Sequence, residues 1–234
     1  MNVLMYILYF VILMIVPMMA QANVMSTFNK YSKVRSTSGL TGKEVAEMIL
    51  RENGIYDVEV LRGQGRLTDH YDPGKKVVVL SPDNYDKPSV SGTAVAAHEV
   101  GHAIQHATGY HFLNFRSALF PLANIGSRFS FILIIAGIAL TVGMQTAGPS
   151  LGTYLLWGGI ALFAFSVLFQ VVTLPVEFDA SNRAMKQIKQ LNIVDEKEHR
   201  HAKKVLNAAA MTYVAATAVA VAELVRLVLI ARNN

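Results

Sequence analysis

The stretch AAHEVGHAIQHATGYH, residues 96–111, brings four histidines and one glutamate into a chain that is otherwise largely apolar. His98 and His102 are four residues apart, so on a helix both side chains project from one face and can ligate the same metal ion. Glu99 lies beside them. In the pattern H-E-x-x-H, this glutamate is placed to take a proton from a water molecule that zinc has acidified. The spacing therefore predicts a catalytic zinc site, with two histidine ligands and a glutamate as general base.

A polar helix face whose histidines only form hydrogen bonds is the alternative to a zinc site. The chain holds 7 histidines among 234 residues, and at such frequencies the full pattern arises by chance in about 1% of chains. Gly101 lowers the helix propensity by about 1 kcal/mol relative to alanine. Its presence predicts that another segment approaches the helix closely at this position.

The third zinc ligand must come from elsewhere, because catalytic zinc normally takes three protein ligands. His106 lies about 12 Å from His98 by helical rise, too far to share its metal. The longer pattern H-E-x-x-H-x-x-G-x-x-H also fails, since Gln105 and Thr108 stand at its glycine and third-histidine positions. We therefore expect His106 and His111 to be solvated or to hydrogen-bond near the metal ligands.

The composition indicates an integral membrane protein. Hydrophobic residues make up 53% of the chain and charged residues 16%, which is too apolar for an average soluble domain. Residues 129–175 carry no charge and suffice for a hairpin of two crossings of about 20 residues each, with its turn in QTAGPSLG, residues 145–152. Residues 205–230 form an alanine-rich helix that is either a further crossing or lies at the membrane surface.

The first apolar segment, residues 1–25, is predicted to be a retained transmembrane anchor. The tripeptide at 20–22, AQA, resembles a signal-peptidase site, but no Lys or Arg precedes the apolar stretch as a secretory signal requires. The chain has no cysteine, which excludes disulfides and cysteine metal sites. Its net charge of +5 does not indicate a nucleic-acid partner, because basic residues are dispersed among acidic ones.

Two polar segments, 26–118 and 176–204, lie on either side of the predicted hairpin. Because a hairpin returns the chain to the membrane face from which it left, both segments must lie on the same side. Lysines and arginines flank the spans on that side, whereas the hairpin turn has no charge, so the positive-inside rule places both segments in the cytoplasm. The expected partners are the lipid bilayer and a protein or peptide substrate.

Local patterns in the first polar segment predict a small α+β unit. TGKEVAEMILRENG, residues 41–54, has the capping signals of an amphipathic helix. Residues 56–61 and 75–81 have the character of strands and predict a small antiparallel sheet, in which Val77–Leu80 offers an open edge to an extended substrate. Ser91 or Thr93 is expected to cap the following helix, 94–107, which carries the two histidines.

The third ligand is expected from LPVEFDASNRAMKQIKQL, residues 174–191, where the hairpin returns to the same face. Pro175 permits a helix to start there, with Glu177 in its first turn. A carboxylate at the membrane edge is unfavourable unless it is paired or bound to a metal. Glu177 is therefore predicted as the third ligand and Asp179 is the competitor. The alternative is that Glu177 only stabilises the positive end of the helix dipole.

The sequence resembles a known family in several of these stretches. AHEVGHAIQ, the apolar hairpin, LPVEFDASNRA and MTYVAA at 211–216 resemble the YugP-like neutral zinc metallopeptidases, which are bacterial membrane proteins, and LTDHYDP and VVVLS fit as well. A more distant similarity is to the gluzincin proteases of the HtpX and CAAX prenyl protease group. The resemblance implies one Zn²⁺ per chain, held by His98, His102 and Glu177, and Glu99 as general base.

One position departs from the gluzincin pattern. In that group the ligating glutamate is commonly followed four residues later by an aspartate that orients a zinc-bound histidine, and Ser181 stands there in this chain. Asp179 and Asn182 are the neighbouring side chains that could form the orienting hydrogen bond instead. Ser181, Asp179, Asn182 and His106 are therefore the candidate partners of the zinc histidines.

The sequence thus predicts a mainly α-helical membrane protein, in which an α+β zincin-like cytoplasmic unit is attached to three or four transmembrane helices. The predicted activity is that of a zinc metalloendopeptidase in a bacterial cell membrane, with Tyr213 either donating to the developing oxyanion or anchoring its helix at the interface. One rival is an intramembrane site-2-type protease, although residues 94–107 are too few to span a bilayer. The other is an inactive scaffold that retains a metal, against which Glu99 argues because structural zinc needs no base.

Overall fold

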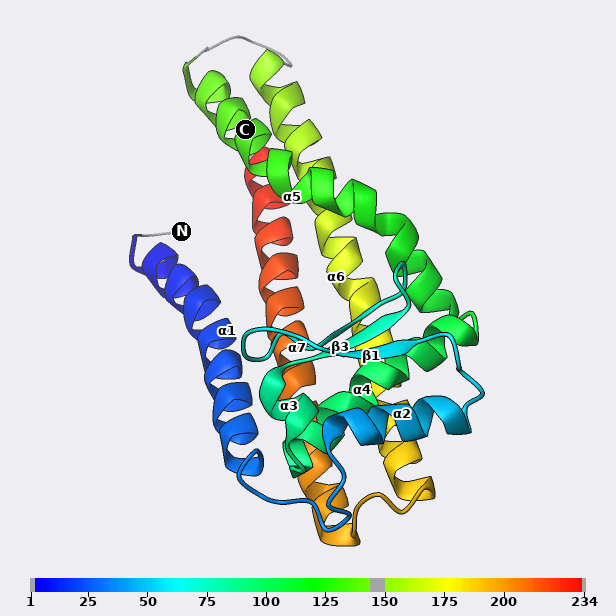
Figure 1. The fold of residues 1–234 in the computed structure, drawn as a ribbon. Helices are drawn as coiled ribbons and strands as arrows, with labels where there is room; N and C mark the ends of the chain where they lie inside the picture. Colours follow the sequence, from blue (N-terminus) through cyan, green and yellow to red (C-terminus); the bar gives the residue numbers. More distant parts are fainter. Residues whose placement is uncertain (1–2, 144–149, 233–234) are drawn as a thin grey trace. The chain divides into compact units, whose positions relative to one another are not determined.

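The computed structural model describes residues 3–143 and 150–232 of the 234. In chain order its elements are α1 (Val3–Tyr31), α2 (Gly42–Glu52), β1 (Glu59–Arg62), β2 (His70–Asp72), β3 (Val77–Leu80), α3 (Pro82–Asp86), α4 (Val90–Ala107), α5 (His111–Gly143), α6 (Leu151–Gln190) and α7 (Glu196–Arg232) (Figure 1). They form two compact units, one of Met1–Leu113 with Pro175–Thr212 and the other of Asn114–Leu174 with Tyr213–Asn234.

The helix predicted over residues 41–54 is confirmed as α2. The Thr41 side chain accepts a hydrogen bond from the backbone of Glu44, and the Glu44 carboxylate accepts one from the backbone of Thr41 at 2.8 Å. This reciprocal pair satisfies two donors that the first turn of a helix leaves open. Gly54 follows the helix with a φ of +68°, a conformation that favours glycine.

The sheet is mixed rather than antiparallel, which corrects the prediction from sequence. Its order is β1-β3-β2, with β1 parallel and β2 antiparallel to β3. The strand missed was β2, because it has only three residues and lies in a segment rich in Gly, Pro and Asp. Since β3 is paired on both sides, Val77–Leu80 has no open edge, and the expectation of substrate pairing there is wrong.

α4 is the central helix of the first unit, and most of its side chains are buried. It begins at Val90, where the Ser89 hydroxyl accepts a hydrogen bond from the Gly92 backbone at 3.0 Å. The predicted caps were Ser91 and Thr93, but both lie inside the helix with no solvent exposure. The helix therefore starts four residues earlier than the apolar pattern suggested. The core around it comes from α2, the sheet, and α6 and α7.

Among the residues that the structure describes, four helices, α1, α5, α6 and α7, are long and apolar enough to cross a membrane. α6 runs without a break through Pro175, so the prediction that Pro175 starts a helix is wrong. A proline removes one backbone hydrogen bond, but transmembrane helices tolerate this where neighbouring groups compensate. The predicted turn at 145–152 falls largely on residues outside those that the structure describes.

In the second unit, glycines let α5 and α6 pack closely. A Cβ on Gly126 would lie 2.3 Å from the backbone oxygen of Leu162, and one on Gly137 2.5 Å from the backbone nitrogen of Leu156. Small residues at such positions are typical of helix packing in membranes. Ile134, Leu156 and Leu227 belong to the apolar core of this unit.

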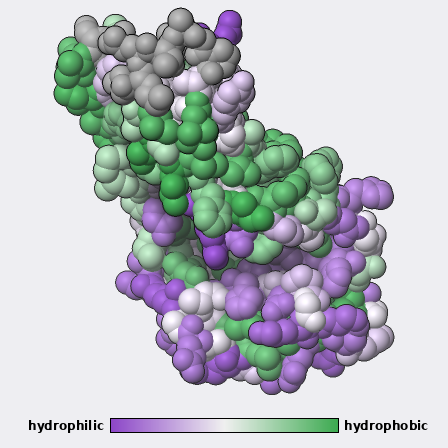
Figure 2. All heavy atoms as spheres, turned by 90° about the horizontal axis from the view of Figure 1, so that it is seen from above, coloured by the Kyte–Doolittle hydropathy of each residue, from purple (hydrophilic) through white to green (hydrophobic). Residues whose placement is uncertain are grey.

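Large apolar side chains are exposed over broad areas of the surface (Figure 2). Val3, Leu4 and Phe131 keep 75%, 73% and 67% of their surface exposed. Soluble monomers rarely expose continuous apolar patches of this kind, whereas lipid-facing helices do so routinely.

Candidate metal centre

His98 and His102 on α4 meet Glu177 on α6. One ligand atom of each residue lies within 4.8 Å of those of the other two. The Oε2 atom of Glu177 is 3.3 Å from Nε2 of His98 and 3.6 Å from Nε2 of His102. The three side chains, which are 79 residues apart in the chain at the widest, therefore converge on one point.

This donor set fits zinc. Two imidazole nitrogens and a carboxylate oxygen are donors that Zn²⁺ takes in catalytic sites, and ligands bound tetrahedrally at about 2.0–2.1 Å lie about 3.3 Å apart. The separations between Glu177 and the two histidines are close to that value. Three protein donors would leave a fourth position for water or substrate.

Glu177 lies deep inside α6, far from either helix end, and only 4% of its surface is exposed. The alternative that it stabilises a helix dipole is therefore excluded, because that effect is confined to the first and last turns. A buried carboxylate requires a compensating partner. The two imidazoles provide it in this structure, and a metal ion held between the three groups would do so more strongly.

α4 and α6 touch at Gly101, as the sequence led us to expect. A Cβ on Gly101 would lie 2.5 Å from the backbone oxygen of Ala180. Ala180 itself is fully buried. This close approach places the two histidines on α4 opposite the Glu177 side chain of α6.

Each histidine has a hydrogen-bond partner on its second ring nitrogen. Nδ1 of His98 is 3.1 Å from the hydroxyl of Ser181, and Nδ1 of His102 is 2.9 Å from Oε1 of Gln105. An amide oxygen only accepts, so Nδ1 of His102 carries a proton, and Nε2 is the ring nitrogen that a metal would bind. Both rings thus turn Nε2 toward Glu177. Orientation of this kind is usual for metal-binding histidines.

Gln105 is the residue that the sequence reasoning did not assign. It is fully buried, and its Nε2 donates to the backbone oxygen of Val176 at 2.8 Å and to Asp179 at 2.9 Å. Both polar atoms of this amide therefore form hydrogen bonds, and these bonds connect α4 to α6. Its position three residues after His102 was the available signal, because residues at that spacing are neighbours on a helix.

The other candidate partners lie elsewhere. The Asp179 carboxylate accepts hydrogen bonds from Gln105 and, at 2.6 Å, from Arg183, so it reaches the histidines only through the amide. Nδ1 of His106 is 2.8 Å from the hydroxyl of Tyr71 on β2. Asn182 is exposed on α6.

Glu99 lies between the ligands on α4 and keeps 8% of its surface exposed. Within the described part of the chain no hydrogen bond holds its carboxylate. Burial raises the pKa of Glu99 above its usual value, although the two histidines act in the opposite direction. Burial also acts to lower the pKa of His102, but the facing Glu177 carboxylate outweighs it and leaves that pKa raised.

Tyr213 lies on α7 in the second unit, and 40% of its surface is exposed. Its role as an oxyanion donor remains a prediction.

Comparison with known proteins gives a consistent picture. Residues 6–232 match the model of a protein family described as "Putative neutral zinc metallopeptidase". The chain is 46% identical over 216 residues to a protein of Bacillus subtilis (strain 168) named "Putative membrane protease YugP". The aligned residues cover 92% of this chain and 91% of the relative. No solved structure matches the chain.

Proposed function

The chain belongs to this neutral zinc metallopeptidase family, and from that premise we propose that it is a membrane-bound zinc endopeptidase whose general base is Glu99. The observation that carries the proposal is the convergence of His98, His102 and Glu177 beside an unpaired, buried glutamate. A structural metal site would need no such base.

His98, His102 and Glu177 are the residues that would hold one zinc ion. When bound there, zinc would polarise the carbonyl of the scissile peptide bond and acidify a water molecule. Ser181 and Gln105 keep the two imidazoles oriented for this task. Glu99 accepts a proton from the attacking water and delivers it to the amine that leaves.

The substrate would lie along β2, which forms an edge of the sheet. Tyr71 on β2 reaches α4 at His106, so this edge runs close to the helix that carries the site. An extended peptide can pair its backbone with such an edge. Pairing of this kind favours unfolded chains or flexible segments as substrates.

We place the site in the cytoplasm of a bacterial cell. Similarity to a membrane protease and four apolar helices indicate a multi-pass membrane protein. The charges near the helix ends support a cytoplasmic location for the residues around α4, by the positive-inside rule. Labelling of single cysteines with a membrane-impermeant reagent, in intact and opened cells, tests this orientation without background because the chain has no cysteine.

Proteolysis in detergent tests the activity. We expect the zinc-loaded wild type to cleave casein or an unfolded membrane protein, and Glu99→Gln to lose about 10²–10⁴-fold in rate while retaining zinc. Glu47→Gln is a matched control, because Glu47 is a partly exposed glutamate on α2 whose side chain pairs with Lys43. Zinc-loaded wild type that cleaves none of these substrates would favour the inactive scaffold.

A further inference from the structure

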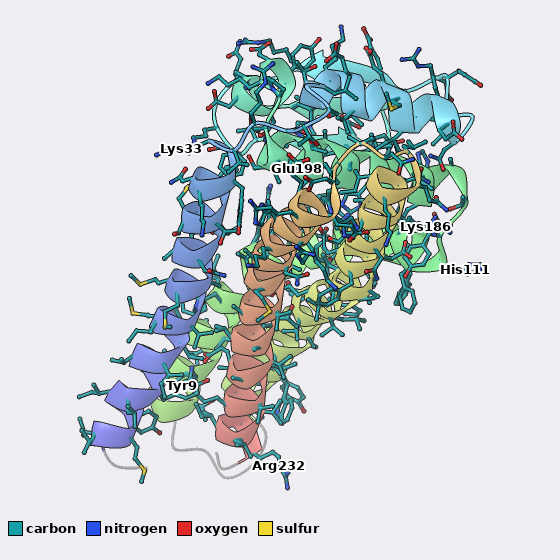
Figure 3. All side chains as sticks on the ribbon, turned by 90° about the horizontal axis from the view of Figure 1, so that it is seen from below. Tyr9, Lys33, His111, Lys186, Glu198 and Arg232 are labelled. Carbon is teal, nitrogen blue, oxygen red and sulfur yellow. The ribbon has the colours of Figure 1, made fainter. Side chains whose placement is uncertain are left out.

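A groove lies between α1 and α7, on a part of the first unit that the metal centre does not use. Its volume is ≈ 470 Å³, within the range of about 300–1,000 Å³ that is usual for small-molecule sites. Its walls are formed by Asn23, Ser26, Thr27, Lys30, Tyr31, Lys204, Asn207, Ala208 and Met211. The last turns of α1 and the first turns of α7 run side by side here, near Lys33 and Glu198 (Figure 3).

The lining is positively charged and contains no acid. Lys30 comes from α1 and Lys204 from α7, and neither forms an ion pair with a carboxylate among the residues that the structure describes. Both are exposed. Among the described residues, five other lysines pair with a nearby aspartate or glutamate, as Lys76 does with Asp57. Two ammonium groups that line one groove without a carboxylate partner attract an anion.

The remaining polar groups in the groove can bind oxygen atoms. Asn23 and Asn207 carry amide donors, and Ser26 and Thr27 carry hydroxyls. Amides, hydroxyls and lysines together are groups that bind the non-bridging oxygens of a phosphate and the hydroxyls attached to it. Tyr31 is part of the lining, and the centre of its ring lies 4.7 Å from that of His201.

His201 lies beside this groove, with its ring against that of Tyr31. Its Nδ1 is buried and forms no hydrogen bond in the described part of the chain. Lys30, Lys197, Arg200 and Lys204 all lie near enough to act on its charge. These four cationic side chains add to the positive potential beside the groove.

The groove also lies where a lipid headgroup would be found. α1 carries no charge before Lys30, and none of its most apolar window is buried inside the protein. Its apolar surface is therefore available to acyl chains along almost the whole helix. The Tyr31 ring packs against His201, and Thr37, shortly after α1, donates two hydrogen bonds to the Glu198 carboxylate. These contacts hold the charged end of α1 near α7.

We propose that this groove is a binding site for the phosphodiester headgroup of an anionic phospholipid, with Lys30 and Lys204 on the phosphate and the acyl chains against α1. The occupant is a lipid of the membrane rather than free phosphate, because the groove continues into an exposed apolar helix surface. The site fixes α1 against α7 and is independent of peptidase activity.

Thermal unfolding of the full-length protein in detergent, after removal of bound lipid, tests this proposal. Dioleoylphosphatidylglycerol is expected to raise the unfolding midpoint in a saturable manner, whereas dioleoylphosphatidylcholine and inorganic phosphate are expected to leave it unchanged. In Lys30→Gln/Lys204→Gln, the half-saturating concentration of dioleoylphosphatidylglycerol should rise about tenfold or more, because two charge-assisted contacts are lost.

Lys33→Gln/Lys203→Gln is the matched control. It removes the same charge from the same two chain segments, but neither lysine lines the groove. Its half-saturating concentration should stay within about twofold of the wild type. Asn207→Trp provides a second test, since it fills the groove while keeping both lysines and should also abolish the stabilisation.

Three results would overturn the proposal. Equal weakening in the two double variants would mean that anionic lipid acts through general charge alone. Equal stabilisation by dioleoylphosphatidylcholine would remove the requirement for an anionic headgroup, and stabilisation by inorganic phosphate alone would assign the groove to free phosphate.

Discussion

Ser181 lies one helical turn beyond Glu177 on α6 and places its hydroxyl 3.1 Å from Nδ1 of His98. A hydroxyl is a neutral hydrogen-bond partner for this ring, where a carboxylate would be a charged one. A neutral partner stabilises the imidazole orientation but adds little to its basicity.

Ser181→Ala is expected to weaken zinc binding about tenfold, at the lower end of the effect of such partners. Ser181→Asp should bind zinc at least as tightly as the wild type, because a carboxylate is the stronger partner for Nδ1–H. Competition with a chelator of known affinity measures both constants. Unchanged affinity in Ser181→Ala would mean that this hydroxyl does not orient His98.

Gln105 supports His102 in a different way, through an amide that also joins α4 to α6. Gln105→Leu should lower zinc affinity by about 10–100-fold, because Nδ1 of His102, the Val176 carbonyl and Asp179 all lose a partner. Asn182→Ala is the control, since Asn182 is exposed on the same stretch of α6. A loss of thermal stability without any loss of zinc affinity would restrict Gln105 to a packing role.

The choice between Glu177 and Asp179 as ligand gives a direct test of the metal centre. Glu177→Ala is expected to be purified without stoichiometric zinc, because only two donors remain. Asp179→Ala should retain the metal, since that carboxylate contacts Gln105 and Arg183 rather than the histidines. Metal analysis by mass spectrometry after dialysis distinguishes the two. Zinc retained in Glu177→Ala and lost in Asp179→Ala would reverse the assignment.

The sequence alone predicted those features of the fold and of the site that follow from one local rule. The four-residue spacing of His98 and His102 and the capping pair of Thr41 and Glu44 depend only on helix geometry. The meeting of Glu177 with the histidines followed from a topological argument, that a two-span hairpin returns to its own side.

Other features depend on tertiary contacts that no local pattern reveals. β2 exists because β3 offers it an edge, although its three residues have little strand character of their own. α6 continues through Pro175 because the residues before and after the proline are held in one helix by their tertiary contacts. Gln105 became recognisable as a partner of His102 only when Val176 and Asp179 were seen to hold its amide.

The contact between Gly101 and Ala180 leads to the last prediction. Gly101→Ala would force its new methyl group to within 2.5 Å of a backbone oxygen, so α4 and α6 must separate, and overpacking of this kind destabilises a core by about 1–3 kcal/mol. The same separation would move the histidines away from Glu177, and zinc affinity should fall together with the unfolding midpoint.

Gly158→Ala is the control: this glycine is also helical, but nothing lies within 4 Å of an added Cβ, and alanine should be neutral or slightly stabilising there. If Gly101→Ala unfolds at the wild-type midpoint and keeps its zinc, the close approach of the two helices is not what positions the ligands.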